Sequence, residues 1–273
     1  MEFNWKAESL LITGASSGLG KALALAGVGL GANVILIGRN EKKLTDVQKK
    51  IERLGGRSHI FAFDLNETDK ISALYRHIAG SMKAPPTVLI NNVGYQVAGF
   101  VQNTPIDVYE KNYRVNVLAP IALIQNALPD MIKQKRGTIV SIMSSVMYRS
   151  FPGVSSYCAS KSALGAIHES LKSELVGLPI KTLYVRPCGF RSDYWKNTDY
   201  GNRLGDFKFN PVQSKDPADL AVAILKAIEQ GKEDVDLGSI VDRVACHLNY
   251  WFPKLVDKMI AKRNSKLINN RPI

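Results

Sequence analysis

The sequence predicts an α/β fold: a Rossmann-type, doubly wound parallel sheet with helices on both faces, in a single domain. Short apolar runs alternate with longer amphipathic stretches, which is typical of buried parallel strands covered by helices. A glycine-rich turn directly follows the first apolar run. No linker rich in Pro, Gly or Ser divides the 273 residues, and no internal repeat is present, so one domain is the simplest organisation.

The predicted elements follow one another in a regular order. A strand over 9–12 leads through the glycine turn into a helix over 18–31, and a strand over 33–37 leads into a charged helix over 41–54. Further buried strands are predicted at 58–63, 87–90, 137–143 and 182–185. We assign 1–238 to the main α/β domain, with a polar, aromatic and basic lid or loop insertion at about 191–211, and 239–273 to an amphipathic, basic extension.

The charge balance is strongly basic. Lys and Arg number 36 against 24 Asp and Glu, which gives a formal net charge of +12. Such a surface attracts nucleic acid, anionic lipid or phosphorylated small molecules, or it serves solubility alone. No recognised nucleic-acid-binding module is present, so we expect no nucleic-acid partner.

Cysteine and histidine usage bears on compartment and metal binding. Three scattered cysteines cannot form a disulfide framework, which favours a reducing, cytoplasmic location. The four histidines lack metal-ligand spacing, so we expect no metal site. We also expect no signal peptide and no run of about 18 uncharged apolar residues that would span a membrane.

The glycine turn has the sequence of a phosphate cradle. Its residues are Thr13, Gly14, Ala15, Ser16, Ser17, Gly18, Leu19 and Gly20. Gly14 permits the tight turn, and Gly18 and Gly20 allow a close approach of backbone to a pyrophosphate and of helix to strand. The free amides and the dipole at the helix start then hold the anion. The alternative is an ordinary glycine-rich loop.

The end of the second strand indicates which dinucleotide binds. Folds that bind NAD often place an acid there to hold the ribose hydroxyls, whereas this chain has Gly38 followed by Arg39. An arginine can form a two-pronged contact with a 2′-phosphate. The sequence therefore favours NADP(H) over NAD(H). The alternative is a surface arginine that caps the strand end.

These motifs resemble those of the short-chain dehydrogenases/reductases, over roughly 10–230. The matching residues are the TGxxxGxG motif at 13–20, Asp64 and Leu65, the NNAG-like Asn91-Asn92-Val93-Gly94, Asn116, Ser144, and Tyr157 with Lys161 in YxxxK. The resemblance implies cofactor contacts from Asp64, Leu65, Asn91, Val93 and Gly94. It implies further contacts near the nicotinamide from Pro187, Gly189, Phe190 and Ser192, where Cys188 replaces the family's glycine and Ser192 its threonine.

The catalytic assignment follows from this resemblance and from simple acid–base chemistry. Tyr157 and Lys161 are four residues apart and share one helix face. A lysine cation beside the phenol lowers the tyrosine pKa from about 10, and the lysine also binds the nicotinamide ribose. Ser144 would hold the substrate carbonyl, and Asn116 would anchor a water for proton resupply. We expect His168, farther along the same helix, at the surface or an interface.

The substrate side is predicted from the segment after the sixth strand. Its aromatic residues, Tyr194, Trp195, Tyr200, Phe207 and Phe209, would line or cover an apolar pocket, and its cations, Arg191, Lys196, Arg203 and Lys208, would meet an anionic group. With Ser144 and Tyr157, Tyr194 and Trp195 are the predicted substrate contacts. A steroid, retinoid, acyl or sphingoid carbonyl would suit this pocket. The alternative is that the aromatic residues only pack the lid against the body.

The tail and the quaternary structure leave several alternatives. A basic amphipathic helix that carries Trp251 and Phe252 can lie in a membrane interface. It can equally pack on a partner subunit or on its own core, and Pro253 is expected to divide it. Resemblance to the family implies a homodimer or homotetramer, to which peripheral membrane contact would be an addition.

The function that these observations predict is an NADP(H)-dependent oxidoreductase that transfers hydride between a nicotinamide and a ketone or secondary alcohol. An NAD-dependent alcohol dehydrogenase is the enzymatic alternative. A non-catalytic NADP(H)-binding protein with a regulatory or membrane-docking role is the alternative from another class. The complete set of Ser144, Tyr157 and Lys161 argues against the latter, because a protein without catalysis has no chemical need of all three.

Overall fold

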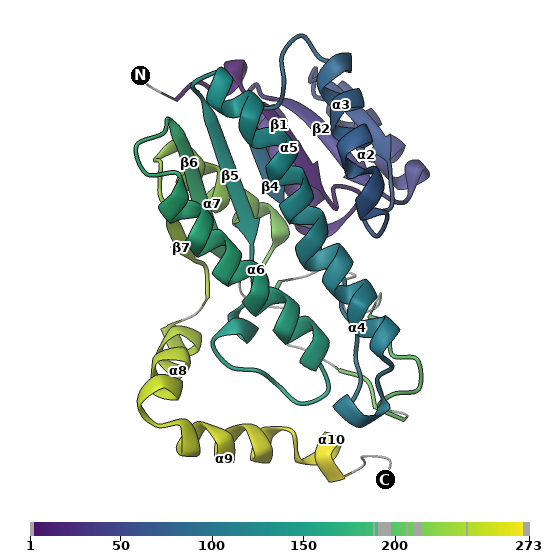
Figure 1. Cartoon of the computed structure of the whole chain (residues 1–273), viewed down its shortest axis with the longest axis vertical. Coiled ribbons are helices and arrows are strands. Elements are labelled where there is room, and N and C mark those ends of the chain that lie inside the picture. Colours follow the sequence, from purple (N-terminus) through teal and green to yellow (C-terminus); the bar gives the residue numbers. More distant parts are fainter. Residues whose placement is uncertain are drawn as a thin grey trace.

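A single parallel sheet of seven strands forms the centre of the molecule (Figure 1). The computed structural model describes residues 3–187, 189–190, 198–205, 207–209, 215–238 and 240–269. Neighbouring strands run in the order β3-β2-β1-β4-β5-β6-β7, and every pair is parallel. The predicted doubly wound α/β fold is confirmed. The strand order reverses between β1 and β4, which is where such sheets open a ligand crevice at their carboxyl edge.

The strands match the predicted apolar runs, with one addition. They are β1 (Ser9–Thr13), β2 (Asn33–Gly38), β3 (Ser58–Ala62), β4 (Val88–Asn91), β5 (Gly137–Ile142), β6 (Ile180–Arg186) and β7 (Asp234–Asp236). The sequence does not predict β7, because its three residues contain no apolar run. Its place is set instead by charge: the Arg186 guanidinium on β6 donates to Asp234 over 2.6 Å and to Asp236 over 3.3 Å.

Some helices cover the two faces of this sheet, and the C-terminal ones lie beyond its carboxyl edge (Figure 1). The helices are α1 (Gly18–Gly29), α2 (Glu41–Arg53), α3 (Ile71–Ser81), α4 (Ile106–Tyr113), α5 (Ala119–Lys133), α6 (Ser155–Glu174), α7 (Pro217–Glu229), α8 (Ile240–Trp251), α9 (Pro253–Arg263) and α10 (Ser265–Asn269). Short 3-10 helices lie at Trp5–Ala7, Thr68–Lys70, Val101–Asn103 and Ser145–Met147, and a π-helix, Arg114–Leu118, joins α4 to α5.

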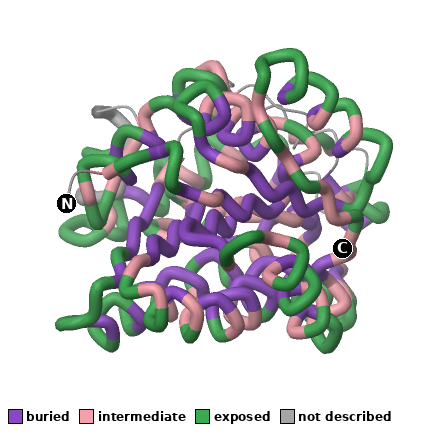
Figure 2. The backbone as a smooth tube through the Cα atoms, turned by 90° about the horizontal axis from the view of Figure 1, so that it is seen from above, coloured by how far each residue is buried: buried purple, intermediate pink, exposed green. Residues whose placement is uncertain are grey.

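Alternate residues of each central strand enter two separate cores. Leu10 and Ile12 of β1 pack with α1, α2 and α7 on one face, whereas Leu11 packs with α3, α5 and α6 on the other. Figure 2 shows the buried backbone as a continuous central layer between exposed outer turns. Each fully buried Leu or Ile stabilises the fold by about 1.5–3 kcal/mol relative to exposure. Because both faces are covered, the central strands are largely apolar runs rather than alternating patterns.

One helical unit of the described chain is long and apolar enough to cross a membrane. It runs from Ile106 to Lys133, with a mean hydropathy of 1.3 in its most apolar window, half of which is buried in the fold. No such segment is predicted from the sequence, because charged residues interrupt this one. Several of its buried side chains, among them Leu123, Ala127 and Met131, belong to the core on the α3–α5–α6 face. The apolar side chains of this segment thus pack against the sheet.

The contact between α1 and the glycine turn can be tested with two glycines of the same helix. A Cβ at Gly20 would overlap the Gly14 carbonyl oxygen and lie 2.7 Å from Asn92 Nδ2, whereas one at Gly29 would meet nothing within 4 Å. We expect Gly20→Ala to lower the free energy of unfolding by about 1–3 kcal/mol. Gly29→Ala should raise it by up to about 1 kcal/mol. Urea unfolding measures both, and equal effects would contradict the tight contact.

Candidate active site

A cavity of about 1040 Å³ opens at the carboxyl edge of the sheet. It brings together sixteen of the predicted site residues, from the glycine turn to the YxxxK helix. They are Gly14, Ser16, Ser17, Gly18, Leu19, Arg39, Asp64, Leu65, Val93, Gly94, Ser144, Tyr157, Lys161, Pro187, Gly189 and Phe190. Gly20, Asn91 and Asn116 do not line it. Ser192, Tyr194 and Trp195 lie outside the described residues.

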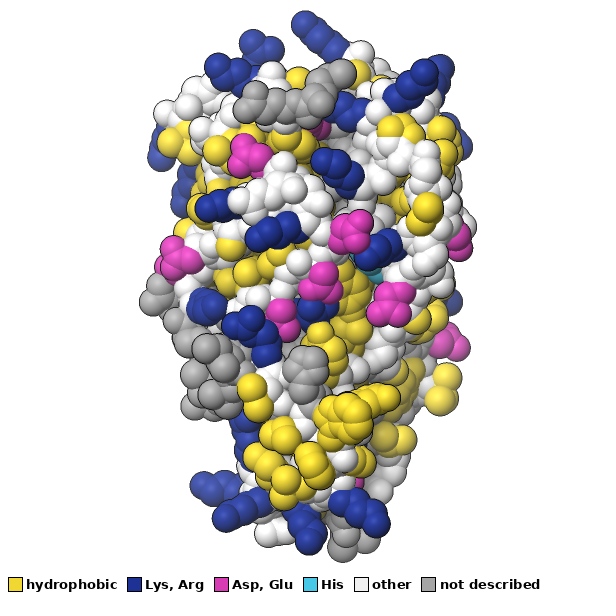
Figure 3. Space-filling model, turned by 90° about the vertical axis from the view of Figure 1, so that its left-hand side faces the viewer, with side chains coloured by type: hydrophobic (Ala, Val, Ile, Leu, Met, Phe, Trp, Pro, Cys, Tyr) yellow, Lys and Arg dark blue, Asp and Glu magenta, His cyan; other side chains and the backbone are white. Residues whose placement is uncertain are grey.

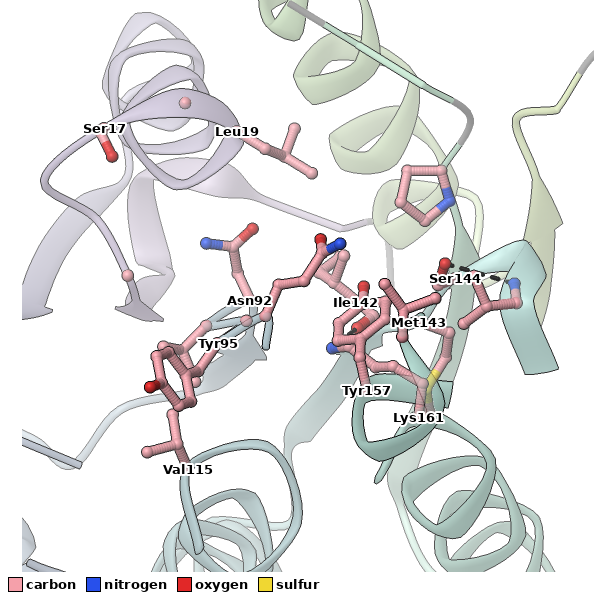
Figure 4. Close-up of a pocket in the computed structure, with 18 of the residues that line it drawn as sticks. Ser17, Leu19, Asn92, Tyr95, Val115, Ile142, Met143, Ser144, Tyr157 and Lys161 are labelled. Atoms are coloured by element: carbon pink, nitrogen blue, oxygen red, sulfur yellow. Dashed lines mark hydrogen bonds between the residues drawn. The ribbon is translucent and has the colours of Figure 1, made fainter. Parts of the chain in front are cut away.

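The glycine turn presents backbone rather than side chains to the cavity. Gly14 and Gly18 have φ angles of 67° and 51°, a left-handed conformation that glycine adopts without the penalty of a Cβ. Ser17 precedes α1 in an extended conformation, and its hydroxyl makes no capping bond to the described helix. The first amides of α1 therefore remain available for an anion. Figure 4 places Ser17 and Leu19 on one side of the cavity, opposite Ser144 and Lys161.

A threonine hydroxyl fastens the glycine turn to the strand across the crevice. Thr13 Oγ1 accepts the backbone N–H of Asn92 and that of Val93, each over 3.0 Å, and donates to the Ile90 carbonyl over 3.4 Å. Asn92 Nδ2 in turn donates to the Thr13 carbonyl over 2.8 Å. The turn at 92–94 is thereby held beside the glycine turn. Asn91 is buried one residue earlier, and neither Nδ2 nor Oδ1 of its side chain has a hydrogen-bond partner among the described residues.

The end of β2 concentrates positive charge beside the glycine turn. Gly38, Arg39, Asn40 and Lys43 all line the cavity. Asn40 caps α2 by accepting the Lys43 N–H over 2.9 Å. The N-terminus of α2 and the Lys43 ammonium group therefore lie at the same end of the cavity as the predicted Arg39. A Cβ at Gly38 would lie 3.5 Å from Ser16 Oγ, at ordinary contact distance, so the end of β2 lies directly beside the glycine turn.

Ser144, Tyr157 and Lys161 converge on the cavity from two adjacent elements. Ser144 follows β5 directly after Met143, and its Oγ accepts the Val146 N–H over 3.4 Å. Tyr157 and Lys161 lie one turn apart on α6, and Lys161 Nζ is 6.0 Å from the centroid of the Tyr157 ring. Figure 4 shows all three side chains on the same wall. The predicted shared helix face is confirmed.

Lys161 is an almost completely buried amine. Its side chain is 2% exposed, and Nζ donates to the Ile142 carbonyl over 2.9 Å. Burial lowers the pKa of Lys161 from 10.5 to about 8, because a low-dielectric surrounding disfavours the charged form. A cation that is poorly solvated by water has a stronger electrostatic effect on a neighbouring phenol or ribose hydroxyl.

Asn116 lies inside the π-helix and binds protein backbone. Its Oδ1 accepts the Tyr95 N–H over 2.8 Å, and its Nδ2 donates to the Tyr95 carbonyl over 2.8 Å. The same Nδ2 lies 3.0 Å from Ser160 Oγ, which donates to the Tyr157 carbonyl over 2.9 Å. Asn116 thus connects the 95–98 segment to the turn that carries Tyr157. π-Helical turns are frequent at functional sites, and the predicted proton relay stays a prediction.

His168 is buried, so its predicted surface position is wrong. Its ring is 2% exposed, and Nδ1 hydrogen-bonds Ser141 Oγ over 2.9 Å, on β5. Burial, and secondarily the nearby Lys172 charge, lowers the pKa of His168 to about 4, which keeps the ring neutral at physiological pH. The physical reason is spacing: His168 is eleven residues after Tyr157, which is three helical turns, so it faces the sheet as Tyr157 does.

The described part of the substrate segment supplies an aromatic wall. Phe207 and Phe209 line the cavity with their ring centroids 5.3 Å apart, and Tyr200 OH accepts the Phe209 N–H over 3.0 Å. The prediction that these aromatics line a pocket is confirmed for the two phenylalanines. Met143 and Phe151 extend the apolar wall. The lid prediction for 191–197 and 210–211 falls outside the described residues.

Arg203 does not meet an anionic ligand, contrary to the prediction. It is 8% exposed and committed to protein: Nε donates to the Ala98 carbonyl over 3.1 Å, and Nη2 pairs with Asp199 Oδ1 at 2.7 Å. Asp199 Oδ2 also accepts the Tyr95 hydroxyl over 2.7 Å. An arginine desolvated to this extent needs such partners, so its role is to hold the substrate segment to the body.

Several cavity residues escaped the sequence analysis. Tyr95 comes from the turn after β4, Lys111 from α4, Val115 from the π-helix, and Arg263 and Asn264 from the end of α9. Tyr95 had a usable signal, since it directly follows the NNAG-like motif. Arg263 had none, because only the return of the tail to the body brings it to the cavity.

The fold and this arrangement of residues define a nucleotide-binding α/β domain of the dehydrogenase type. A family model, short chain dehydrogenase, matches residues 8–202, and the chain belongs to that family. Mouse dehydrogenase/reductase SDR family member 7B is 32% identical over 263 residues, which are 94% of this chain and 81% of the mouse protein.

Solved structures show the same similarity. A short-chain dehydrogenase from Streptomyces avermitilis is 28% identical, with a TM-score of 0.78 over 95% of this chain and 98% of its own. A metagenomic short-chain oxidoreductase, solved in complex with NADP, is 26% identical, with a TM-score of 0.70 over 85% of this chain and 96% of its own.

The buried amine predicts a pH-dependent stability difference between the wild type and Lys161→Met. The pKa of Lys161 is about 8 in the folded protein against 10.5 as the ordinary value. Between these values the unfolded chain binds more protons, so the lysine's contribution to stability rises with pH and is lost below about pH 8. We expect the wild type to gain about 2 kcal/mol over the variant from about pH 7 to about pH 9.5. A pH-independent difference in urea unfolding would contradict a buried charge.

Proposed function

We propose that this chain is an NADP(H)-dependent oxidoreductase that interconverts an apolar ketone and its secondary alcohol. The observation that carries the proposal is one continuous cavity with the glycine turn at one end and Ser144, Tyr157 and Lys161 at the other. A dinucleotide fits this cavity by three features: left-handed glycines at 14 and 18, the open amides of α1, and a buried lysine at the far end. When bound, the nicotinamide supplies or accepts the hydride.

The residues of the chain supply the proton and hold the carbonyl. Tyr157 donates a proton to the substrate oxygen in reduction and accepts it in oxidation. The buried Lys161 cation stabilises the phenolate that this step leaves. Ser144 donates a hydrogen bond to the same oxygen, which orients the carbonyl and stabilises developing negative charge.

The preference for NADP(H) over NAD(H) rests on the charge at the end of β2. Arg39 and Lys43 line the cavity beside the capped N-terminus of α2, and Gly38 offers no carboxylate for ribose hydroxyls. A phosphate on the adenosine ribose would meet two cations and a helix dipole there. The NADP found in the metagenomic relative supports the same choice.

An apolar substrate is favoured by the wall opposite the dinucleotide end. Phe207, Phe209, Phe151 and Met143 give the cavity a largely apolar lining near Ser144. A steroid, retinoid, acyl or sphingoid carbonyl would bury hydrocarbon against these side chains and leave its oxygen for Ser144 and Tyr157.

The role of Tyr157 predicts a selective loss of turnover in Tyr157→Phe. Without the hydroxyl no proton reaches the carbonyl oxygen, so we expect kcat to fall at least about 100-fold. The dissociation constant for NADPH, measured by its fluorescence, should change little. Tyr113→Phe, at an exposed position on α4, serves as the matched control. Full turnover of Tyr157→Phe on any accepted ketone would exclude the mechanism.

The role of Arg39 predicts a selective loss of affinity for the phosphorylated cofactor. Removal of a two-pronged contact to a phosphate in Arg39→Ala should raise KM for NADPH roughly tenfold or more, since charged hydrogen bonds contribute about 1.5–3 kcal/mol. KM for NADH should stay within about twofold. Arg53→Ala, which removes the same charge at the exposed end of α2, provides the control. An unchanged preference would remove Arg39 from cofactor selection.

A further inference from the structure

The helices after β7 carry a cluster of apolar side chains that the fold leaves exposed. This C-terminal apolar patch consists of Val244, Tyr250, Trp251, Phe252, Leu255 and Met259. Tyr250 is 78% exposed and Trp251 71%. Figure 3 shows apolar side chains gathered at the end of the molecule where α8 and α9 lie in Figure 1, with Lys and Arg around them. Monomeric proteins rarely leave such clusters without a ligand or partner.

The patch is not the side of the tail that packs on the body. Along α9, Val256 is buried, and Leu267 of α10 packs with Ala98 and Leu204. Leu255 and Met259, four residues apart, are 51% and 55% exposed. Helical spacing therefore separates an inward apolar stripe, which is satisfied, from an outward one, which is not.

Positive charge borders the outward stripe. Lys254, Lys258 and Lys262 repeat every four residues and are all exposed. Asp257, the acidic residue on α9, forms an ion pair with Arg149. We propose that the C-terminal apolar patch and these three lysines dock the protein on an anionic lipid bilayer surface, with Trp251 and Phe252 in the headgroup region. Aromatic residues favour that region, and lysines are drawn to the negative leaflet.

Charge complementarity favours a bilayer over a second copy of the chain. In a twofold-symmetric pair, the same patch faces itself, so each row of lysines would approach the other. A bilayer with anionic lipids offers apolar depth for the aromatic side chains and negative charge for the lysines. The net charge of +12 adds a long-range attraction to such a surface.

The patch has a fixed position relative to the cavity. Asn249 Nδ2 on α8 donates to the Tyr148 carbonyl over 3.0 Å, and Asp257 on α9 pairs with Arg149. Both contacts are made to the segment that follows Ser144. Arg263 and Asn264 then line the cavity. Docking would hold the cavity near the lipid surface, so that an apolar substrate could enter from the bilayer; this last step rests on the proposed function.

Sedimentation with vesicles tests the proposal without any substrate. Vesicles of phosphatidylcholine with phosphatidylserine, and vesicles of phosphatidylcholine alone, are incubated with the full chain. We expect binding to the anionic vesicles and at least tenfold weaker binding to the neutral ones. Binding should also weaken at about 0.5 M salt, where the Debye length is only about 4 Å.

Two sets of variants identify the residues. Lys254→Gln, Lys258→Gln and Lys262→Gln combined should weaken anionic-vesicle binding roughly 100-fold, at about 1 kcal/mol for each lysine. The control has the same charge change on exposed lysines elsewhere: Lys42→Gln, Lys49→Gln and Lys133→Gln. Trp251→Ser with Phe252→Ser should weaken binding at least about tenfold. The matched control, Leu54→Ser with Val176→Ser, changes exposed apolar residues outside the C-terminal apolar patch and should have little effect on vesicle binding.

The results can overturn the proposal in two ways. Equal binding by the tail variants and their controls would show that the net charge alone binds vesicles. Light scattering that shows a smaller assembly for Trp251→Ser with Phe252→Ser, with vesicle binding absent from the wild type, would assign the patch to a second copy. Reduction of a water-soluble ketone, measured in parallel without vesicles, reports on the proposed function independently of docking.

Discussion

The cavity depends on how the turns after β1 and β4 are connected although the helices that follow these strands diverge. Their strand order reverses at this point, so the helices that follow them depart to opposite faces and leave a crevice. The hydroxyl of Thr13 bridges that crevice by satisfying two amides and one carbonyl of the facing turn. Both glycine-rich turns are thereby fixed without a bulky side chain between them, which leaves backbone amides directed toward an anion.

The second half of the cavity is organised by a costly burial. The Lys161 ammonium group loses its hydration and gains one hydrogen bond, to a carbonyl of β5. Its desolvation is offset only by further interaction of the charge with a ligand or with the phenol. His168, three turns along α6 from Tyr157, holds the same strand through Ser141. The helix that carries the proposed acid–base pair is thus bonded at two points to β5, the strand that leads to Ser144. Rigid placement of this kind is what proton transfer in a site requires.

Sequence patterns predicted those parts of the molecule that are governed by local rules. The alternation of apolar runs gave the sheet, and the spacing of Tyr157 and Lys161 gave their common helix face. Strand β7 was not predicted, because its position depends on the pairing of Asp234 with Arg186, a residue distant in sequence. Arg203 was misjudged because its partner Asp199 and its burial are products of tertiary folding. Arg263 reaches the cavity only through the path of the tail, which no local pattern encodes.

A chain of polar contacts runs from the substrate segment to the catalytic helix. Asp199 holds the hydroxyl of Tyr95, Asn116 holds the backbone of Tyr95, and Ser160 connects Asn116 to the turn of Tyr157. Residues beside the proposed substrate wall therefore share partners with residues that position Tyr157, the proposed proton donor. A substitution near Asp199 that changes the substrate preference of this protein would therefore also change its turnover. New selectivity would be acquired more readily by substitutions away from Asp199.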